Sequence, residues 1–209
     1  MLKDNTVAIY IIVDDILQKI DYKEDSQRRV TDALILTTVL VSSWYFGGNW
    51  ESARCYMLQH HCKNMVDKSR FCRRVHGCRE LAIWLFSILS WISKELNYRQ
   101  RYILDTFPVA VCHNIRIKNC RLLTDEDFRG KSTSKREYFY GFKVALLIDE
   151  HGNPIELAMY AGAYSEQSAL HRMDFDLPKG SIVWQDSGFT DYEWEDFYME
   201  NEGIEFATQ

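Results

Sequence analysis

Hydrophobic residues in the first 97 positions recur every three or four residues, which is the spacing of amphipathic helices. Few glycines or prolines interrupt these runs, and the pattern predicts helices over residues 7–20, 28–45, 50–60 and 79–96. Two of these helices carry an apolar stripe that we expect to face the core. The stripes are Val30, Leu34, Thr37, Thr38 and Val41 in the second helix, and Leu81, Leu85, Ile88 and Ile92 in the fourth.

After residue 99 the pattern changes to short apolar runs bounded by turn residues. RYILDTFPVAV predicts a strand ending near Pro108, and YFYGFKVALLIDEHGNPIELAMYAGA predicts a hairpin with its turn at 149–154. The polar segment 124–137 is expected to be a mobile linker. The remaining predicted elements are a helix near 165–173, a buried strand in GSIVWQDSGF, a helix over 190–202 and a strand in GIEFATQ.

A meander of strands followed by strands that alternate with helices is typical of a mixed sheet covered by helices. We therefore predict an α+β chain with a boundary near Asn97. A helical N-terminal domain would span residues 1–97, and a mixed sheet flanked by helices would span residues 98–209.

Composition and charge restrict the classes of function. No run of about 20 apolar residues lacks a charge, so we predict a cytoplasmic protein that does not enter a membrane. The net charge of -5 argues against nucleic acid as a partner, because binding phosphate requires clustered Lys and Arg. The charge is uneven, however, since residues 63–79 are strongly basic and residues 174–209 strongly acidic. A basic face on an acidic chain is therefore compatible with DNA binding.

Two aspartates have matching surroundings. Asp105 follows the apolar run Tyr102-Ile103-Leu104, and Asp186 follows Ser181-Ile182-Val183-Trp184 and precedes Ser187-Gly188. Carboxylates at two neighbouring strand ends can hold Mg²⁺, which completes its coordination with water and substrate phosphate. Alternatively, each Asp simply caps the turn that follows it. These two interpretations stay open from the residues alone.

The second half of the chain resembles a known family. YILDTFPVAVCHNIRI, FRGKSTSKREYFYGFKVALLIDEHGNPIE, YSEQSAL, DFDLPKGS and QDSGFTDYEWEDF occur in the order found in bacterial insertion-sequence transposases of the DDE class. The resemblance covers residues 101–206 and implies a ribonuclease-H-like fold. It also implies that Asp105 and Asp186 are the first two catalytic acids and that they hold two Mg²⁺ ions, with Mn²⁺ as a substitute.

The third acid of that family, a Glu on a later helix, has no counterpart before Gln209. We therefore expect an incomplete, truncated catalytic domain with impaired activity. The helix after Asp186 carries other acids, which we interpret as its solvated face. These are Glu193, Glu195, Asp196, Glu200 and Glu202.

Basic residues are the candidates for contacts with DNA phosphates, which position a duplex without reading its sequence. In the second domain they are Lys131, Lys135, Arg136 and Lys143, the last expected near Asp105. In the helical domain they are Arg70, Arg73 and Arg74, on a segment that is otherwise an ordinary solvated helix face. A zinc site among His60, His61, Cys62, Cys72, His76 and Cys78 is not favoured, because their spacing matches no standard ligand pattern.

The resemblance implies a function in DNA transposition: binding of the element's terminal repeats, Mg²⁺-dependent cleavage, and strand transfer to target DNA. The expected partners are DNA and either further copies of the chain or an intact transposase, in the bacterial cytoplasm near the nucleoid. Three alternatives stay open. They are a DNA-binding remnant that inhibits intact transposase, a metal-dependent nuclease, and a split gene whose downstream frame supplies the missing Glu.

Overall fold

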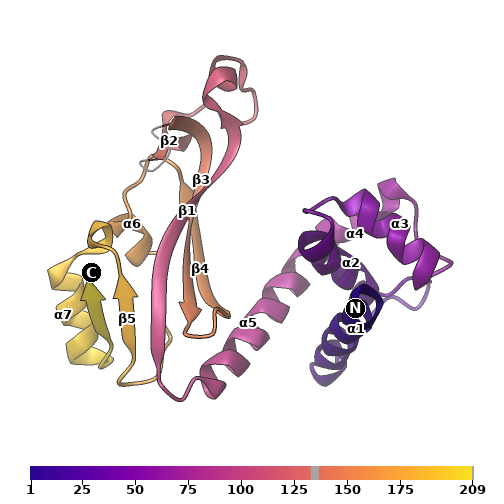
Figure 1. The fold of residues 1–209 in the computed structure, drawn as a ribbon, viewed down its shortest axis with the longest axis horizontal. Helices are drawn as coiled ribbons and strands as arrows, with labels where there is room; N and C mark the ends of the chain where they lie inside the picture. Colours follow the sequence, from indigo (N-terminus) through magenta and orange to yellow (C-terminus); the bar gives the residue numbers. More distant parts are fainter. Residues whose placement is uncertain (133–136, 209) are drawn as a thin grey trace. The chain divides into compact units, whose positions relative to one another are not determined.

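The computed structural model describes residues 1–132 and 137–208, with the side chains of 113–115 left out. The chain forms two compact units, Met1–Ser87 and Ile88–Gln209 (Figure 1). The first unit is helical and the second is built on a six-stranded mixed sheet, so the predicted α+β class is confirmed. Among the described residues, no helix combines the length and apolar character needed to cross a membrane.

The helices of the first unit are α1 (Leu2–Lys19), α2 (Asp32–Tyr45), α3 (Trp50–His60) and α4 (Lys68–Gly77), and α5 (Arg79–Leu96) continues into the second unit. Polar N-caps start three of them. Thr31, Asn49 and Asp67 each accept a hydrogen bond from a backbone N–H in the first turn of the helix. The predicted stripe is largely buried, with Val41 of α2 at 0% exposure and Val30 at 1%, but the helix begins at Asp32 and Val30 precedes it.

Helix α4 has no counterpart among the predicted helices, because it buries only Phe71. Most of its other residues are charged or polar, and an apolar period is therefore absent from the sequence. Its start depends on Asp67, whose side chain accepts from the Arg70 N–H at 2.9 Å. A cap and one anchoring aromatic are sufficient to define this helix within the packed unit.

The second unit contains β1 (Arg101–His113), β2 (Arg129–Ser132), β3 (Glu137–Asp149), β4 (Pro154–Ala161), β5 (Ile182–Gln185) and β6 (Glu205–Thr208). The helices beside them are α6 (Gln167–Leu170) and α7 (Tyr192–Asn201), with short 3-10 turns η1 (Asn114–Asn119), η2 (Glu126–Phe128) and η3 (Ser187–Phe189). The strand order is β2-β3-β1-β5-β6, and β4 also pairs with β3. β1, β3 and β4 are antiparallel neighbours, while β1, β5 and β6 are parallel.

The core of this unit lies on one face of the sheet. Side chains alternate between the two faces of a strand, and on β1 the buried residues are Tyr102 and Leu104. They pack with residues from β3, β4, β5 and α6, among them Leu147, Leu170 and Val183. On the other face of β1, Ile103, Asp105 and Phe107 are exposed. Asp105 thus projects from the face opposite the core.

Two expectations are corrected by the strands. β1 does not end near Pro108 but continues to His113, and it pairs with β3 along this length (Figure 1). Residues 129–132, within the segment expected to be a mobile linker, form β2 and pair with residues 137–140 of β3. Backbone hydrogen bonding to a long neighbouring strand orders β2 although its sequence, RGKS, carries no apolar pattern.

Candidate functional site

Parallel pairing of β1 with β5 brings Asp105 and Asp186 into register. The last backbone pair of the two strands is Ile103 with Trp184, and these residues are 81 positions apart in the chain. Asp105 and Asp186 are separated by the same 81 positions. They therefore occupy equivalent places on the two strands, just beyond the last paired residues.

The expectation that each acid ends a strand holds for Asp186 alone, which follows the last residue of β5. Asp105 lies inside β1, opposite Leu146 of β3. What ends at this point is the pairing between β1 and β5. The divergence of the two strands leaves an opening between them at the level of the two acids.

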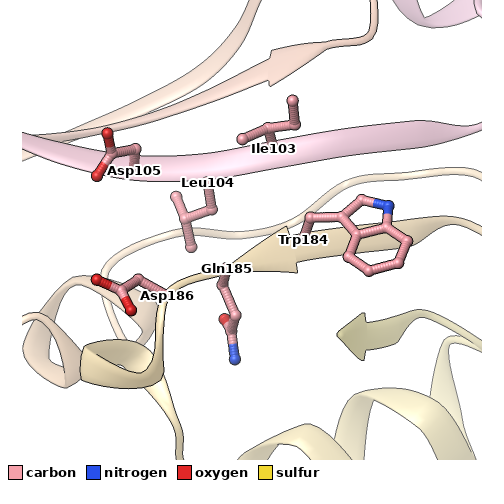
Figure 2. Close-up of a pocket in the computed structure, with 6 residues that line it drawn as sticks. All are labelled: Ile103, Leu104, Asp105, Trp184, Gln185 and Asp186. Atoms are coloured by element: carbon pink, nitrogen blue, oxygen red, sulfur yellow. The ribbon is translucent and has the colours of Figure 1, made fainter. Parts of the chain in front are cut away.

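That opening is a cleft of about 550 Å³, lined by Ile103, Leu104, Asp105, Trp184, Gln185 and Asp186. In Figure 2 the Asp105 and Asp186 carboxylates lie at the same end of this cleft, away from the Trp184 indole. Both aspartates are exposed to solvent. The site therefore combines two accessible carboxylates with an apolar wall.

The two carboxylates make the same local hydrogen bond. Oδ1 of Asp105 accepts from the Thr106 N–H at 2.7 Å, and Oδ1 of Asp186 accepts from the Ser187 N–H at 2.6 Å. Asp186 also caps η3, as the alternative interpretation of this residue predicted. No hydrogen bond or ion pair from another described residue reaches either Oδ2. In each Asp, a backbone N–H therefore fixes Oδ1, while Oδ2 is available to bind a cation.

The two carboxylates can supply some, but not all, of the oxygen ligands that a hard divalent cation requires. Carboxylate oxygens are the ligands that Mg²⁺ uses, and it commonly takes one or two of them and fills its remaining positions with water and phosphate. Within residues 1–132 and 137–208, no group of three or more His, Cys, Asp or Glu side chains is arranged to hold a metal. The residues present fit a metal site that remains open to solvent and substrate.

Gln185 lines the same cleft and was missed in the sequence. Its side chain is 3% exposed, and Nε2 donates to Glu195 Oε1 at 2.7 Å. Glu195 on α7 is therefore half-buried and bonded, and its assignment to a solvated helix face was wrong. The available signal was a Gln inside an otherwise apolar strand, since a buried amide requires a partner.

Lys143 does not lie beside Asp105 as expected. It pairs with Pro108, whereas Asp105 pairs with Leu146, so the alternation of side chains puts Lys143 and Asp105 on opposite faces of the sheet. The Lys143 ammonium donates to the Tyr164 carbonyl at 2.9 Å. This bond gives the side chain a local structural role.

Lys131 is exposed on β2, where it pairs with Tyr138 of β3. The Tyr138 ring is 43% exposed, with the Arg129 guanidinium 5.3 Å and the Lys131 ammonium 5.9 Å from its centroid. Cations beside an exposed aromatic ring form a surface suited to an anionic partner. Lys135 and Arg136, the other candidates in this segment, lie outside the described residues.

The three candidate arginines of α4 have different surroundings. Arg70 and Arg73 are exposed, and Arg70 lies 3.4 Å from Asp67. Arg74 is only 18% exposed and donates through Nε to Asp32 Oδ1 at 3.1 Å. Its guanidinium is held inside the helical unit, so its placement differs from that expected of a DNA contact.

A family model described as "Transposase DDE domain" matches residues 97–209, more than half of the chain. No curated protein sequence matches. One similar solved structure is the cryo-EM structure of piggyBac transposase in a synaptic complex with hairpin DNA, with 13% sequence identity and a TM-score of 0.38. The likeness covers 96% of this chain and 47% of that one, so this chain spans about half the length of its structural neighbour. On the family match, the chain belongs to the transposase DDE domain family.

Proposed function

We propose that this chain acts in DNA transposition of an insertion sequence, with Asp105 and Asp186 as catalytic metal ligands. The observation that supports this most is the shared register of the two aspartates in one cleft. The family match covers the segment that contains both residues. A structural cap explains Asp186 but leaves the exposed Asp105 carboxylate, in the middle of a strand, without a role.

The chemistry proposed for the site follows from its residues. The backbone N–H groups of Thr106 and Ser187 fix one oxygen of each Asp, which leaves the second oxygen to bind a cation. Bound Mg²⁺, or Mn²⁺ in its place, would stabilise the charge that develops when a phosphodiester is cleaved, and two ions would serve attacking and leaving oxygens. The exposure of both carboxylates leaves room for a DNA backbone in the cleft.

DNA is the proposed partner, and the solved neighbour is itself a complex with hairpin DNA. In the helical domain, residues 1–97, the exposed Arg70 and Arg73 are proposed to contact the phosphates of the element's ends. In the DDE domain, Lys131 is proposed to do so, together with Lys135 and Arg136. Arg74 and Lys143 are proposed to act as structural residues because their cationic groups already have protein partners.

The assembly and setting of the reaction are also proposals. We propose that the chain assembles with further copies of itself or with an intact transposase. The bacterial cytoplasm, at the nucleoid, is the proposed location.

The experiment is cleavage of a labelled duplex carrying the element's own ends, with Mg²⁺ or Mn²⁺. It compares the parent chain with Asp105→Asn and Asp186→Asn, and uses Asp176→Asn, an exposed acid outside the cleft, as the matched control. Because impaired activity is expected of this chain, we expect weak metal-dependent cutting by the parent and the control and its loss in both site variants. Equal cutting by all four proteins would contradict the proposal.

Two alternatives have distinct outcomes in this assay. The absence of a third acidic ligand near the pair, among the described residues, favours a chain that binds DNA without cutting it and thereby inhibits an intact transposase. Retarded but uncut DNA would support that alternative. Cutting without any joined product would support a metal-dependent nuclease.

A further inference from the structure

Glu166, the residue before α6, lies in the segment YSEQSAL and makes a contact that the sequence did not indicate. It is half-buried, and its Oε1 accepts a hydrogen bond from the Thr106 hydroxyl at 3.0 Å. Thr106 follows Asp105 directly, and its N–H is the group that fixes Asp105 Oδ1. Glu166 is therefore one residue removed from the first acid of the cleft.

The same carboxylate also reaches the segment that carries Asp186. A Cβ added to Gly188 would lie 2.1 Å from Glu166 Oε2, closer than any side chain permits. Gly188 does not have a positive φ, so the backbone conformation does not require glycine there. The absence of a side chain at Gly188 is what admits the Glu166 carboxylate against η3.

A buried tyrosine lies behind this contact. Tyr160 is 4% exposed and belongs to the buried core of the sheet unit. Burial and the nearby negative charge of Glu166 raise the pKa of Tyr160 to about 12. The Glu166 carboxylate is therefore close enough to this buried phenol to affect its ionisation, and it also contacts Thr106 and lies beside Gly188.

We infer that Glu166 is a positioning residue that sets the separation of Asp105 and Asp186. The inference rests on the proposed function of the two aspartates as metal ligands. Backbone pairing of β1 with β5 stops at Ile103 and Trp184, so it does not fix the chain at the acids themselves. Beyond that point, the Glu166 carboxylate accepts a hydrogen bond from the Thr106 hydroxyl and packs against the backbone at Gly188.

This role is distinct from that of a metal ligand. Thr106 follows Asp105 on the strand, so its side chain points to the opposite face of the sheet. Glu166 reaches the pair from that opposite face. Groups that hold ligands from behind commonly change metal affinity on the order of 10–100-fold when removed.

The test measures Mn²⁺ affinity by electron paramagnetic resonance for the full chain and its variants. Glu166→Ala and Thr106→Val are each expected to weaken binding about tenfold, and the double variant no more than either single one, because both remove one bond. Glu166→Gln, which still accepts from the Thr106 hydroxyl, is expected to restore most of the affinity. Glu193→Ala on the exposed face of α7 is the matched control and should bind as the parent does.

Three outcomes would each overturn the inference. The Mn²⁺ affinity could be unchanged in Glu166→Ala, the losses could add in the double variant, or Glu166→Gln could bind as weakly as Glu166→Ala. A second readout needs no metal. Thr106→Val is expected to shift the Gly188 amide resonance in the parent but not in the Glu166→Ala background, and an unshifted resonance in the parent would also overturn it. If the parent binds no Mn²⁺, the proposed function fails, while this resonance still decides whether Glu166 joins the two segments.

Discussion

Arg74 of α4 reaches back across the helical unit to Asp32 at the start of α2, where the carboxylate is only 1% exposed. Arg74 also donates to the Val30 carbonyl at 2.9 Å, and Arg28, Tyr22 and Cys78 donate further hydrogen bonds to the Asp32 carboxylate. A buried carboxylate requires such partners, since an unpaired charge is costly away from water. Arg74 is therefore a structural residue within a basic helix.

Arg74→Ala is predicted to destabilise the helical unit by about 3 kcal/mol, because it leaves Asp32 buried without its main partner. Amide hydrogen exchange measures this loss of stability, because the backbone amides of α2 and α4 should exchange faster in the variant. Arg73→Ala, a change of the same chemistry at an exposed position one residue away, should alter exchange by less than about 0.5 kcal/mol. Equal effects of the two substitutions would mean that the Asp32 contact contributes little.

Asp32 should also make stability depend on pH. Burial opposes its ionisation, but hydrogen bonds from Arg74, Tyr22 and Cys78 outweigh burial and hold the pKa of Asp32 below its usual value of 3.8. Because the folded-state pKa is depressed, the contribution is fully present above the unfolded pKa and is lost as the pH falls through the folded one. Urea unfolding from about pH 6 to about pH 2 should show the stability difference between the parent and Asp32→Asn shrinking below about pH 4.

Binding of Mn²⁺ to the cleft should stabilise the sheet unit. At a concentration about 100 times the dissociation constant, the gain is about 2.7 kcal/mol, seen as a higher Tm. Asp186→Asn should abolish the gain. It should not lower the Tm of the metal-free chain, because it removes an exposed charge near another of the same sign. Asp186→Ala removes the acceptor for the Ser187 N–H, which Asp186→Asn retains. A metal-free Asp186→Ala chain much less stable than the parent would therefore point to capping as the main role of Asp186.

Gly141 on β3 is predicted not to tolerate a side chain. A Cβ there would lie 2.2 Å from the Val109 carbonyl oxygen, near the irregularity in the β1–β3 register between Ala110 and Cys112. Gly141→Ala should cost at least 1–3 kcal/mol or so in urea unfolding, the usual range for overpacking. Gly77→Ala is the matched control, because nothing lies within 4 Å of its added Cβ and alanine favours a helix.

Arg73→Ala should weaken binding to duplex DNA without changing the fold. The loss of one phosphate contact is expected to reduce the slope of log affinity against log salt by about 0.9. Fluorescence anisotropy at several salt concentrations measures this slope. Lys3→Ala, on the exposed surface of α1, serves as the charge-matched control. An unchanged slope in Arg73→Ala would remove this helix from the proposed interface.

The sequence predicted the helices and strands whose burial follows a regular period. The β3–β4 hairpin has its turn at Asp149 to Pro154 as expected, and the order of the later elements is also confirmed. α4 and β2 were missed because a cap, one anchoring side chain and backbone pairing define them. The helical stripe on α5 is confirmed only in part, since Leu85 is buried and Ile92 is 37% exposed.

The sequence predicted the two main residues of the candidate site, but it did not predict the residues that contact and position them. Matching local surroundings pointed to Asp105 and Asp186, and their roles as ligands stay predictions. Local sequence could not indicate that Glu166 would contact Thr106, 60 positions away, or that Arg74 would turn inward to Asp32. Such contacts depend on strand register and helix packing, which the pattern of a single element does not contain.

The 81 positions between Asp105 and Asp186 also determine when the cleft can form during folding. β3, β4 and α6 lie between the two residues in the chain, so β5 can pair with β1 only after a long loop closes, and closing long loops is slow. We therefore expect the two carboxylates to meet late, once the antiparallel strands have a surface on which β5 can add. Metal binding at this cleft would then be a measurable sign that β5 has paired with β1 and that the sheet is complete.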